Sequence, residues 1–185
     1  MAARKAQAGG TDRPRPGPEP RGGVVAVVAE KPSVARDVAA VLGATKRGDG
    51  CLAGPGYVVT WAIGHLVAFA EPGQMRPEWQ TWRRDQLPML PGEWPLVVLD
   101  RAKEQFAAVK RVLSDPEVTE VVCATDAGRE GELIFRQLYE ASRCRKPVKR
   151  LWISSLTPEA IREGLAKLRP AKEYDRLADA ARGRS

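Results

Sequence analysis

Length and composition exclude a membrane protein, because the 185 residues, 43% of them hydrophobic, contain no apolar run of the roughly 18 residues that a membrane span needs. No signal-peptide core opens the chain, and three cysteines without a Cys-x-x-Cys pair fit free thiols in a reducing cytoplasm. The formal net charge of +7 favours a polyanionic partner, although a modest excess of arginine also serves solubility alone.

The first 23 residues differ in composition from the rest of the chain. Prolines alternate there with polar residues and glycine, and apolar side chains larger than alanine are nearly absent. Such a composition cannot bury a core, so we expect residues 1–23 to be a disordered basic leader. Nonspecific contact with nucleic acid is a second use for this segment. We expect the folded domain to span residues 24–170.

A strand, a charged turn and a helix open the folded domain. Residues 24–29 form an unbroken apolar run, which is typical of a strand buried on both faces. Glu30 and Lys31 follow, and Ser33 is a suitable N-cap for a helix that Gly43 ends. Glu30 is therefore expected at the carboxyl end of a strand.

The stretch between residues 44 and 114 has a weaker pattern. Its lone histidine, His65, follows a β-branched and aromatic run, and residues 71–94 form an irregular excursion rich in Pro, Trp and Arg. Trp79 and Trp82 in that excursion either stack on bases or pack on the core. The elements expected are a loop or hairpin at 44–56, strands at 57–63 and 96–99, and helices near 78–84 and at 102–114.

A second strand–turn–helix unit carries the most polar turn of the chain. Residues 121–124 are an apolar strand, and a helix follows as far as about Ser142. Between them lie Gly128, Gly131 and the charged residues Asp126, Arg129, Glu130 and Glu132. If this strand is a parallel neighbour of residues 24–29, Asp126 and Glu30 converge at the edge where α/β sheets bind ligands. Carboxylates there suit Mg²⁺ and Arg129 suits a phosphate, whereas the alternative is a solvated loop.

The last part of the chain returns to a strand and a helix. The basic turn at residues 143–150 is interpreted as a solvated face, followed by a strand at 151–153. Thr157 and Pro158 are start signals for a helix that Pro170 stops, and residues 171–185 form a further helix. The alternation of strands and helices predicts an α/β fold with a mostly parallel sheet flanked by helices. No Walker loop or Gly-x-Gly-x-x-Gly is present, which disfavours a nucleotide-binding enzyme.

Three stretches, residues 28–33, 124–134 and 150–157, resemble type IA DNA topoisomerases, and the bacterial topoisomerase III branch is the closest. They match the N-terminal TOPRIM domain of these enzymes, which has a Rossmann-like α/β fold. The resemblance extends over residues 24–185. It implies that residues 24–170 are the TOPRIM domain and that 171–185 begin a helical segment leading to a DNA-gate domain that this sequence lacks.

The resemblance also implies roles for single residues. Glu30 would bind Mg²⁺ or act as general acid and base, Asp126 and Glu130 would complete the metal ligands, and His65 would touch DNA. Lys31 and Arg129 would stabilise the reacting phosphate. Charge alone adds the basic turn, Arg182 and Arg184 as candidate DNA contacts.

Two departures from the family pattern affect the expected function. Gly128 replaces the second aspartate of an Asp-x-Asp pair, and Tyr57, Tyr139 and Tyr174 are the only tyrosines, none of them in a nucleophile-bearing domain. We therefore expect the Mg²⁺-binding part of a cytoplasmic, nucleoid-associated topoisomerase that acts on single-stranded segments of underwound DNA. It would be truncated before its catalytic tyrosine and inactive alone. The alternatives are a free-standing TOPRIM nuclease and a catalytically empty DNA-binding remnant.

Overall fold

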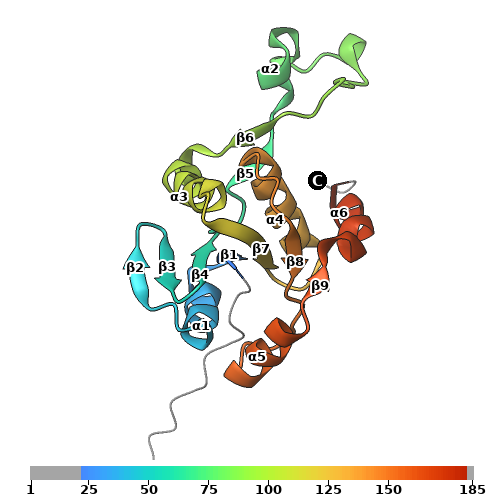
Figure 1. The fold of residues 1–185 in the computed structure, drawn as a ribbon. Coiled ribbons are helices and arrows are strands. Elements are labelled where there is room, and N and C mark those ends of the chain that lie inside the picture. The colour runs from blue at the N-terminus through green and yellow to red at the C-terminus, as the bar shows by residue number, and fades with distance from the viewer. Residues whose placement is uncertain (1–21, 183–185) are drawn as a thin grey trace, which may run out of the picture.

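The computed structural model describes residues 22–182 and has a seven-stranded sheet at its centre (Figure 1). Residues 1–21 of the expected leader and Arg184 lie outside the described residues. In spatial order the strands are β2 (Lys46–Gly48), β3 (Cys51–Gly54), β4 (Tyr57–Trp61), β1 (Val24–Ala29), β7 (Val118–Ala124), β8 (Val148–Arg150) and β9 (Arg169–Pro170).

The four central strands, β4, β1, β7 and β8, are parallel, whereas the outer pairings β2–β3, β3–β4 and β8–β9 are antiparallel. β1 is buried over nearly its whole length because helices cover both faces of the sheet. The last residues of β1 and β7, Ala29 and Ala124, lie opposite each other. The carboxyl ends of the two strands therefore meet at one edge, as the expected α/β arrangement requires.

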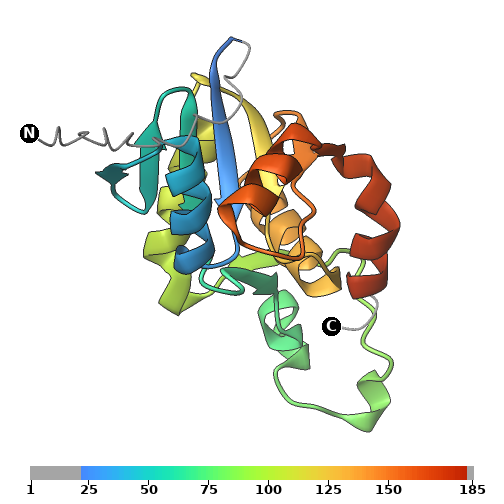
Figure 2. The ribbon, with the colours of Figure 1, turned by 90° about the horizontal axis from the view of Figure 1, so that it is seen from below.

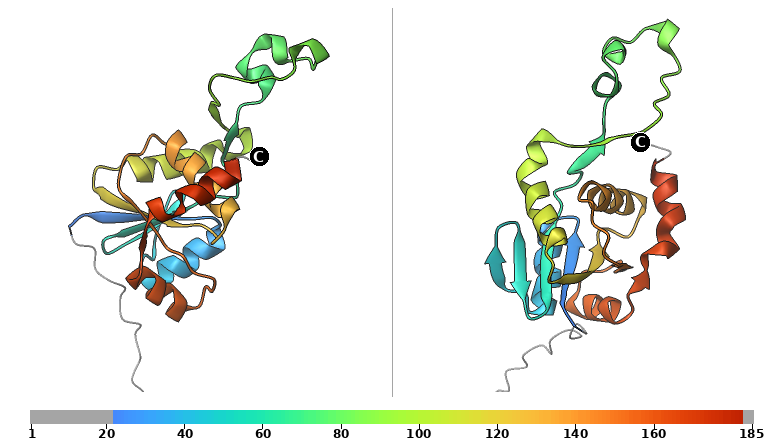
Figure 3. Two further views of the ribbon diagram at one scale, coloured as in Figure 1. Left: turned by 90° about the vertical axis from the view of Figure 1, so that its right-hand side faces the viewer. Right: turned by 45° about the horizontal axis from the view of Figure 1, so that its top comes forward.

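Two hydrophobic clusters hold the helices against the sheet. These helices are α1 (Pro32–Leu42), α3 (Lys103–Ser114), α4 (Arg129–Ala141) and α5 (Pro158–Ala166). A further helix, α6 (Asp175–Arg182), packs on α4 instead. Val25 and Val27 of β1 pack with α1 and α5, whereas Ala26 and Val28 pack with α3 and α4. The left view of Figure 3 shows the sheet edge-on between these two layers of helices, and Figure 2 looks onto the side that carries α1 and α5. Alternate side chains of one strand thus supply both halves of the core.

An arm projects from the sheet between β5 (Val67–Phe69) and β6 (Leu96–Val98), which form a separate two-stranded ribbon (Figure 3). The arm contains the short helix α2 (Pro72–Met75) and the 3₁₀ turns η1 (Pro77–Trp79) and η2 (Arg84–Gln86). The helix predicted at 78–84 is therefore wrong. Pro72 and Pro77 each occupy the start of a new short turn, where proline fits, and so divide the segment. Trp79 is buried beneath Arg76, whereas Trp82 is exposed.

Several boundaries differ from the sequence predictions. The strand predicted at 151–153 lies earlier, at β8, because pairing with β7 ends at Arg150. Lys31 rather than Ser33 is the N-cap of α1, since Pro32 occupies the first helical position. Thr157 caps α5 as predicted, with its hydroxyl accepting a hydrogen bond from the Ala160 N–H at 3.3 Å.

The remaining predicted elements are present, with adjusted ends. The hairpin, α3 and α4 form as predicted. A 3₁₀ turn, η3 (Asp100–Ala102), directly precedes α3. A second one, η4 (Ala171–Tyr174), directly precedes the final helix, which therefore begins at Asp175. Across residues 22–182, no helix combines the length and the apolar character that crossing a membrane requires. The division at residue 170 stays a prediction.

Replacing Leu138 by Ala should lower the free energy of unfolding by about 2–5 kcal/mol, because Leu138 is buried between α4 and the sheet and its loss leaves a cavity. Leu156 is 45% exposed, so Leu156→Ala should change the same quantity by less than about 0.5 kcal/mol. Urea unfolding followed by circular dichroism measures both. Equal effects of the two substitutions would contradict the assigned core.

Candidate functional site

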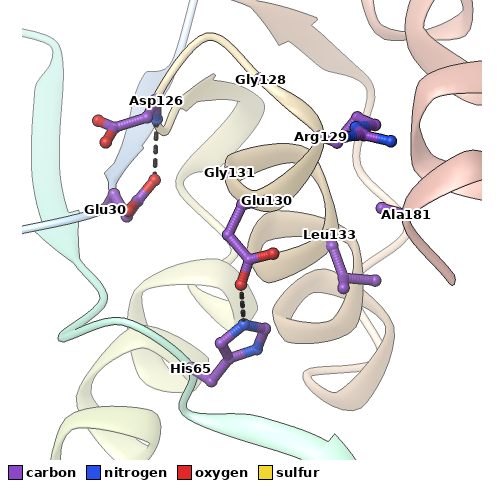
Figure 4. Close-up of a pocket in the computed structure, with 9 residues that line it drawn as sticks. All are labelled: Glu30, His65, Asp126, Gly128, Arg129, Glu130, Gly131, Leu133 and Ala181. Carbon is purple, nitrogen blue, oxygen red and sulfur yellow. Dashed lines mark hydrogen bonds and ion pairs between the residues drawn. The ribbon is translucent and has the colours of Figure 1, made fainter. Parts of the chain in front are cut away.

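Glu30 and Asp126 lie together at the carboxyl edge of β1 and β7 (Figure 4). The backbone N–H of Asp126 donates to Glu30 Oε2 at 3.0 Å, so the two turns are joined directly. Glu30 is buried, at 7% exposure, whereas the carboxylate of Asp126 is open to solvent. The structure thus brings together the two acids whose convergence the strand ends predict.

The ammonium group of Lys31 bridges these two acids. Its Nζ lies 3.2 Å from Asp126 Oδ2 and 3.7 Å from Glu30 Oε1. The hydrogen bond that Lys31 donates to Asp126 and the attraction of both carboxylates raise the pKa of Lys31, which stays charged at neutral pH. Two carboxylates converging on one positive group mark a place that favours a cation.

Glu130 lies in the same pocket but points elsewhere. Its Oε1 is 2.5 Å from His65 Nε2, and His65 Nδ1 is 3.3 Å from Gln137 Oε1. In Figure 4 the Glu130 side chain turns toward His65 and away from Glu30 and Asp126. Consistent with this, no group of three or more His, Cys, Asp or Glu side chains within residues 22–182 is arranged to hold a metal ion.

A pocket of about 530 Å³ contains most of the predicted site residues. Its lining comprises Glu30, His65, Asp126, Gly128, Arg129, Glu130, Gly131, Leu133 and Ala181. Arg129 is exposed and points away from the acid pair (Figure 4), and its side chain has no hydrogen bond or ion pair within the described residues. Ala181 places α6 beside the pocket, a contribution that no sequence signal indicated.

Arg182 does not join this pocket. Its Nη2 lies 3.3 Å from Glu140 Oε2 and so ties the end of α6 to α4. Its expected role in DNA binding stays a prediction, as does that of Arg184, which lies outside the described residues.

Sequence reasoning missed two buried charges, Glu132 and Arg150, each with a side chain 1% exposed. Their oppositely charged groups pair at 3.2 Å. The sequence pattern instead predicts Arg150 in a solvated basic turn and Glu132 in the polar turn after residues 121–124. The interpretation of residues 143–150 as a solvated face is therefore wrong for Arg150. One available signal was the spacing of Glu132 and Arg136, which form an i,i+4 pair on α4.

Comparison with known proteins identifies the fold family. The family model described as the Toprim domain matches residues 25–156, well over half of the chain. The chain belongs to the Toprim family. DNA topoisomerase 3 from Shouchella clausii (strain KSM-K16) is 52% identical over 160 residues, and DNA topoisomerase 3 from Bacillus subtilis (strain 168) is 52% identical over 159 residues.

The matched region is only part of those relatives. Each of the two alignments covers 86% of this Toprim chain and 22% of the relative, so the chain spans about a fifth of their length. Full-length topoisomerase I from Thermotoga maritima has a similar fold, with a TM-score of 0.57 and 21% identity over 86% of this chain and 23% of that chain. The resemblance expected from the sequence is confirmed as a Toprim domain that matches the N-terminal region of bacterial DNA topoisomerase 3.

Replacing Gly131 by Ala should displace the Asp126 turn, because an added Cβ would lie 2.3 Å from the carbonyl oxygen of Asp126. We expect a loss of about 1–3 kcal/mol in the free energy of unfolding, measured by urea titration. The matched control is Gly128→Ala. At Gly128 the backbone is extended and an added Cβ meets nothing within 4 Å, so the loss there should stay below about 1 kcal/mol. A larger loss for Gly128→Ala than for Gly131→Ala would contradict the geometry of this turn.

Proposed function

We propose that this Toprim domain is the Mg²⁺-binding part of a type IA DNA topoisomerase, which breaks and rejoins one DNA strand. The observation that carries the proposal is the convergence of Glu30 and Asp126 on the ammonium group of Lys31. The identity of about half the aligned residues to DNA topoisomerase 3 supports it. The substrate would be a single-stranded segment of underwound DNA in the cytoplasm, close to the nucleoid.

The residues at the acidic edge fit Mg²⁺ by their donor chemistry. Mg²⁺ prefers oxygen ligands and is usually held by one or two carboxylates, with waters and substrate phosphates completing its coordination. Glu30 and Asp126 supply two carboxylates, and Glu130 would be a third if it left His65. Bound there, the ion would offset the negative charge of the DNA phosphate. A site that leaves most positions to water and phosphate agrees with the lack of a ready three-residue cluster within the described residues.

The chain's own side chains have separate tasks in this proposal. Glu30, buried at the carboxyl end of β1, would give a proton to the departing 3′ oxygen and take it back on resealing. Lys31 would stabilise negative charge on the reacting phosphate. Arg129, whose guanidinium is open to solvent, would bind a neighbouring phosphate, and His65 would contact DNA at the rim of the pocket.

None of the three tyrosines is placed as a nucleophile, which supports the proposal that the catalytic tyrosine lies in another domain. Tyr57 is buried in β4. Tyr139 donates a hydrogen bond to the carbonyl of Lys146 at 2.6 Å, and burial raises the pKa of Tyr139 to about 12. Tyr174 is buried and stacks on Trp152, with ring centroids 4.5 Å apart. No tyrosine lines the pocket that holds Glu30 and Asp126.

The chain alone should therefore fail to relax supercoiled DNA, even with Mg²⁺, in a gel assay. Addition of a separately made tyrosine-bearing domain from a topoisomerase 3 relative should restore cleavage, and Glu30→Gln should abolish the restored cleavage because it removes the proton donor. Relaxation by the isolated chain that is lost on replacing Tyr57, Tyr139 or Tyr174 by Phe would overturn the proposal. Mg²⁺-dependent nicking by the isolated chain would instead identify a nuclease. Salt-sensitive DNA binding with no cleavage even after the tyrosine-bearing domain is added would identify a noncatalytic remnant.

Replacing Gly128 by Asp should strengthen Mg²⁺ binding by about tenfold, equivalent to about 1.4 kcal/mol, because it adds a carboxylate to the pocket lining. The position has room, since an added Cβ meets no atom within 4 Å. Gly128 is also the N-cap of α4, where Asp and Asn are both favourable, so Gly128→Asn controls for capping without adding charge. Isothermal titration calorimetry with Mg²⁺ measures the affinities, and equal affinities for the Asp and Asn variants would contradict this placement of the metal.

A further inference from the structure

The guanidinium of Arg150 is buried at the carboxyl edge of the sheet, where hydrogen-bond acceptors surround it. Its side chain is 1% exposed. Its Nε donates a hydrogen bond to Glu132 Oε2 at 3.2 Å, and its Nη2 donates to the carbonyl of Asp126 at 2.8 Å. Its Nη1 donates to three carbonyls, those of Cys123 at 3.1 Å, Thr125 at 2.8 Å and Leu151 at 2.8 Å. One side chain of β8 thereby holds the first two residues of the turn that follows β7, Thr125 and Asp126.

The turn needs such a partner because it lies beyond the paired part of the sheet. Pairing of β7 with β8 ends at Cys123 opposite Arg150, and pairing with β1 ends at Ala124. The carbonyls of Thr125 and Asp126 therefore have no strand opposite them. Buried carbonyls without a donor are costly, and the fork of Arg150 supplies the donors that a further strand residue would otherwise provide.

Asp126 is held by its main chain from two sides. Its N–H donates to Glu30, and its C=O accepts from Arg150. Gly131 packs so closely on the same peptide that no side chain fits between them. With both backbone groups fixed, the direction in which the Asp126 carboxylate leaves the chain is set before any ligand arrives.

Glu132 supplies the charge that allows Arg150 to be buried. Its Oε2 accepts from Arg150 and its Oε1 accepts from Arg136 Nε at 2.9 Å. Arg136 in turn lies 2.9 Å from Asp175 Oδ1 at the start of α6. A buried ion pair is a poor source of stability compared with apolar side chains of similar size, so its presence here calls for a role beyond packing.

We propose that Arg150, with Glu132 as its counter-ion, is a positioning residue for the acidic edge: it fixes the Asp126 main chain so that the Asp126 carboxylate meets Glu30 in the geometry for binding a divalent cation. The expected effect on metal binding rests on the proposed function. The effect on the Asp126 turn is independent of that function.

Two variants of the full chain separate positioning from mere stability. Arg150→Lys keeps a positive charge beside Glu132 but lacks the fork that serves several carbonyls. The double variant Glu132→Met with Arg150→Met removes both charges together and fills the space with apolar side chains, which leaves no unpaired buried charge. The matched control is Glu120→Met with Lys149→Met, which removes a partly exposed 2.8 Å ion pair between β7 and β8, away from the turn.

The measurements are Mn²⁺ affinity by electron paramagnetic resonance, with Mn²⁺ as a probe for Mg²⁺, and hydrogen exchange of the Asp126 amide by NMR. We expect both Arg150 variants to bind Mn²⁺ at least about tenfold more weakly and to exchange the Asp126 amide at least about tenfold faster. The control should match the unmodified chain in both. Thermal unfolding reports separately whether each variant folds.

Each outcome decides the proposal. The proposal would be overturned if the Arg150 variants fold and keep both the Mn²⁺ affinity and the Asp126 amide exchange rate of the unmodified chain. If the double variant does not fold, the same two measurements on Arg150→Lys decide. If the unmodified chain binds no Mn²⁺ but the Asp126 amide still exchanges faster in the variants, positioning of the turn stands and the proposed metal-dependent function fails.

Discussion

The parallel pairing of β1 with β7 is the constraint on which the rest of this structure depends. Both strands lie at the centre of the sheet, buried on each face by helices, so neither can shift without exposing its apolar side chains. Their last residues, Ala29 and Ala124, are register partners. Glu30 and Asp126 therefore leave the sheet at the same place, and the hydrogen bond between them follows from that register.

Much of this arrangement could be predicted from the sequence because it depends on local pattern. Continuous apolar runs such as residues 24–29 identify strands buried on both faces, and alternation with helical spacing implies parallel order. Acidic residues placed just after two such strands then have to converge. Gly43 ends α1 in the left-handed conformation, at φ 71°, as a glycine after a helical pattern predicts.

The features that escaped prediction depend on contacts between distant parts of the chain. Charged residues are almost never fully buried, so a run of basic residues is reasonably assigned to solvent, and nothing local singles out Arg150. Its burial follows from facing Glu132 and the open carbonyls after β7, a contact that only the assembled sheet creates. The pairing of Glu130 with His65, 65 residues away, is equally invisible in the sequence.

The two outer strands have a consequence for how this molecule behaves in concentrated solution. An open sheet edge offers unpaired N–H and C=O groups to any other strand and so invites chains to stack edge to edge. On one side β2 is only three residues long, exposed throughout, and carries Lys46 and Arg47. On the other, β9 has two residues, one of which, Pro170, lacks the N–H that a new partner would need. Like charges and a missing donor thus discourage fibre-like association of a sheet whose interior strands are strongly apolar.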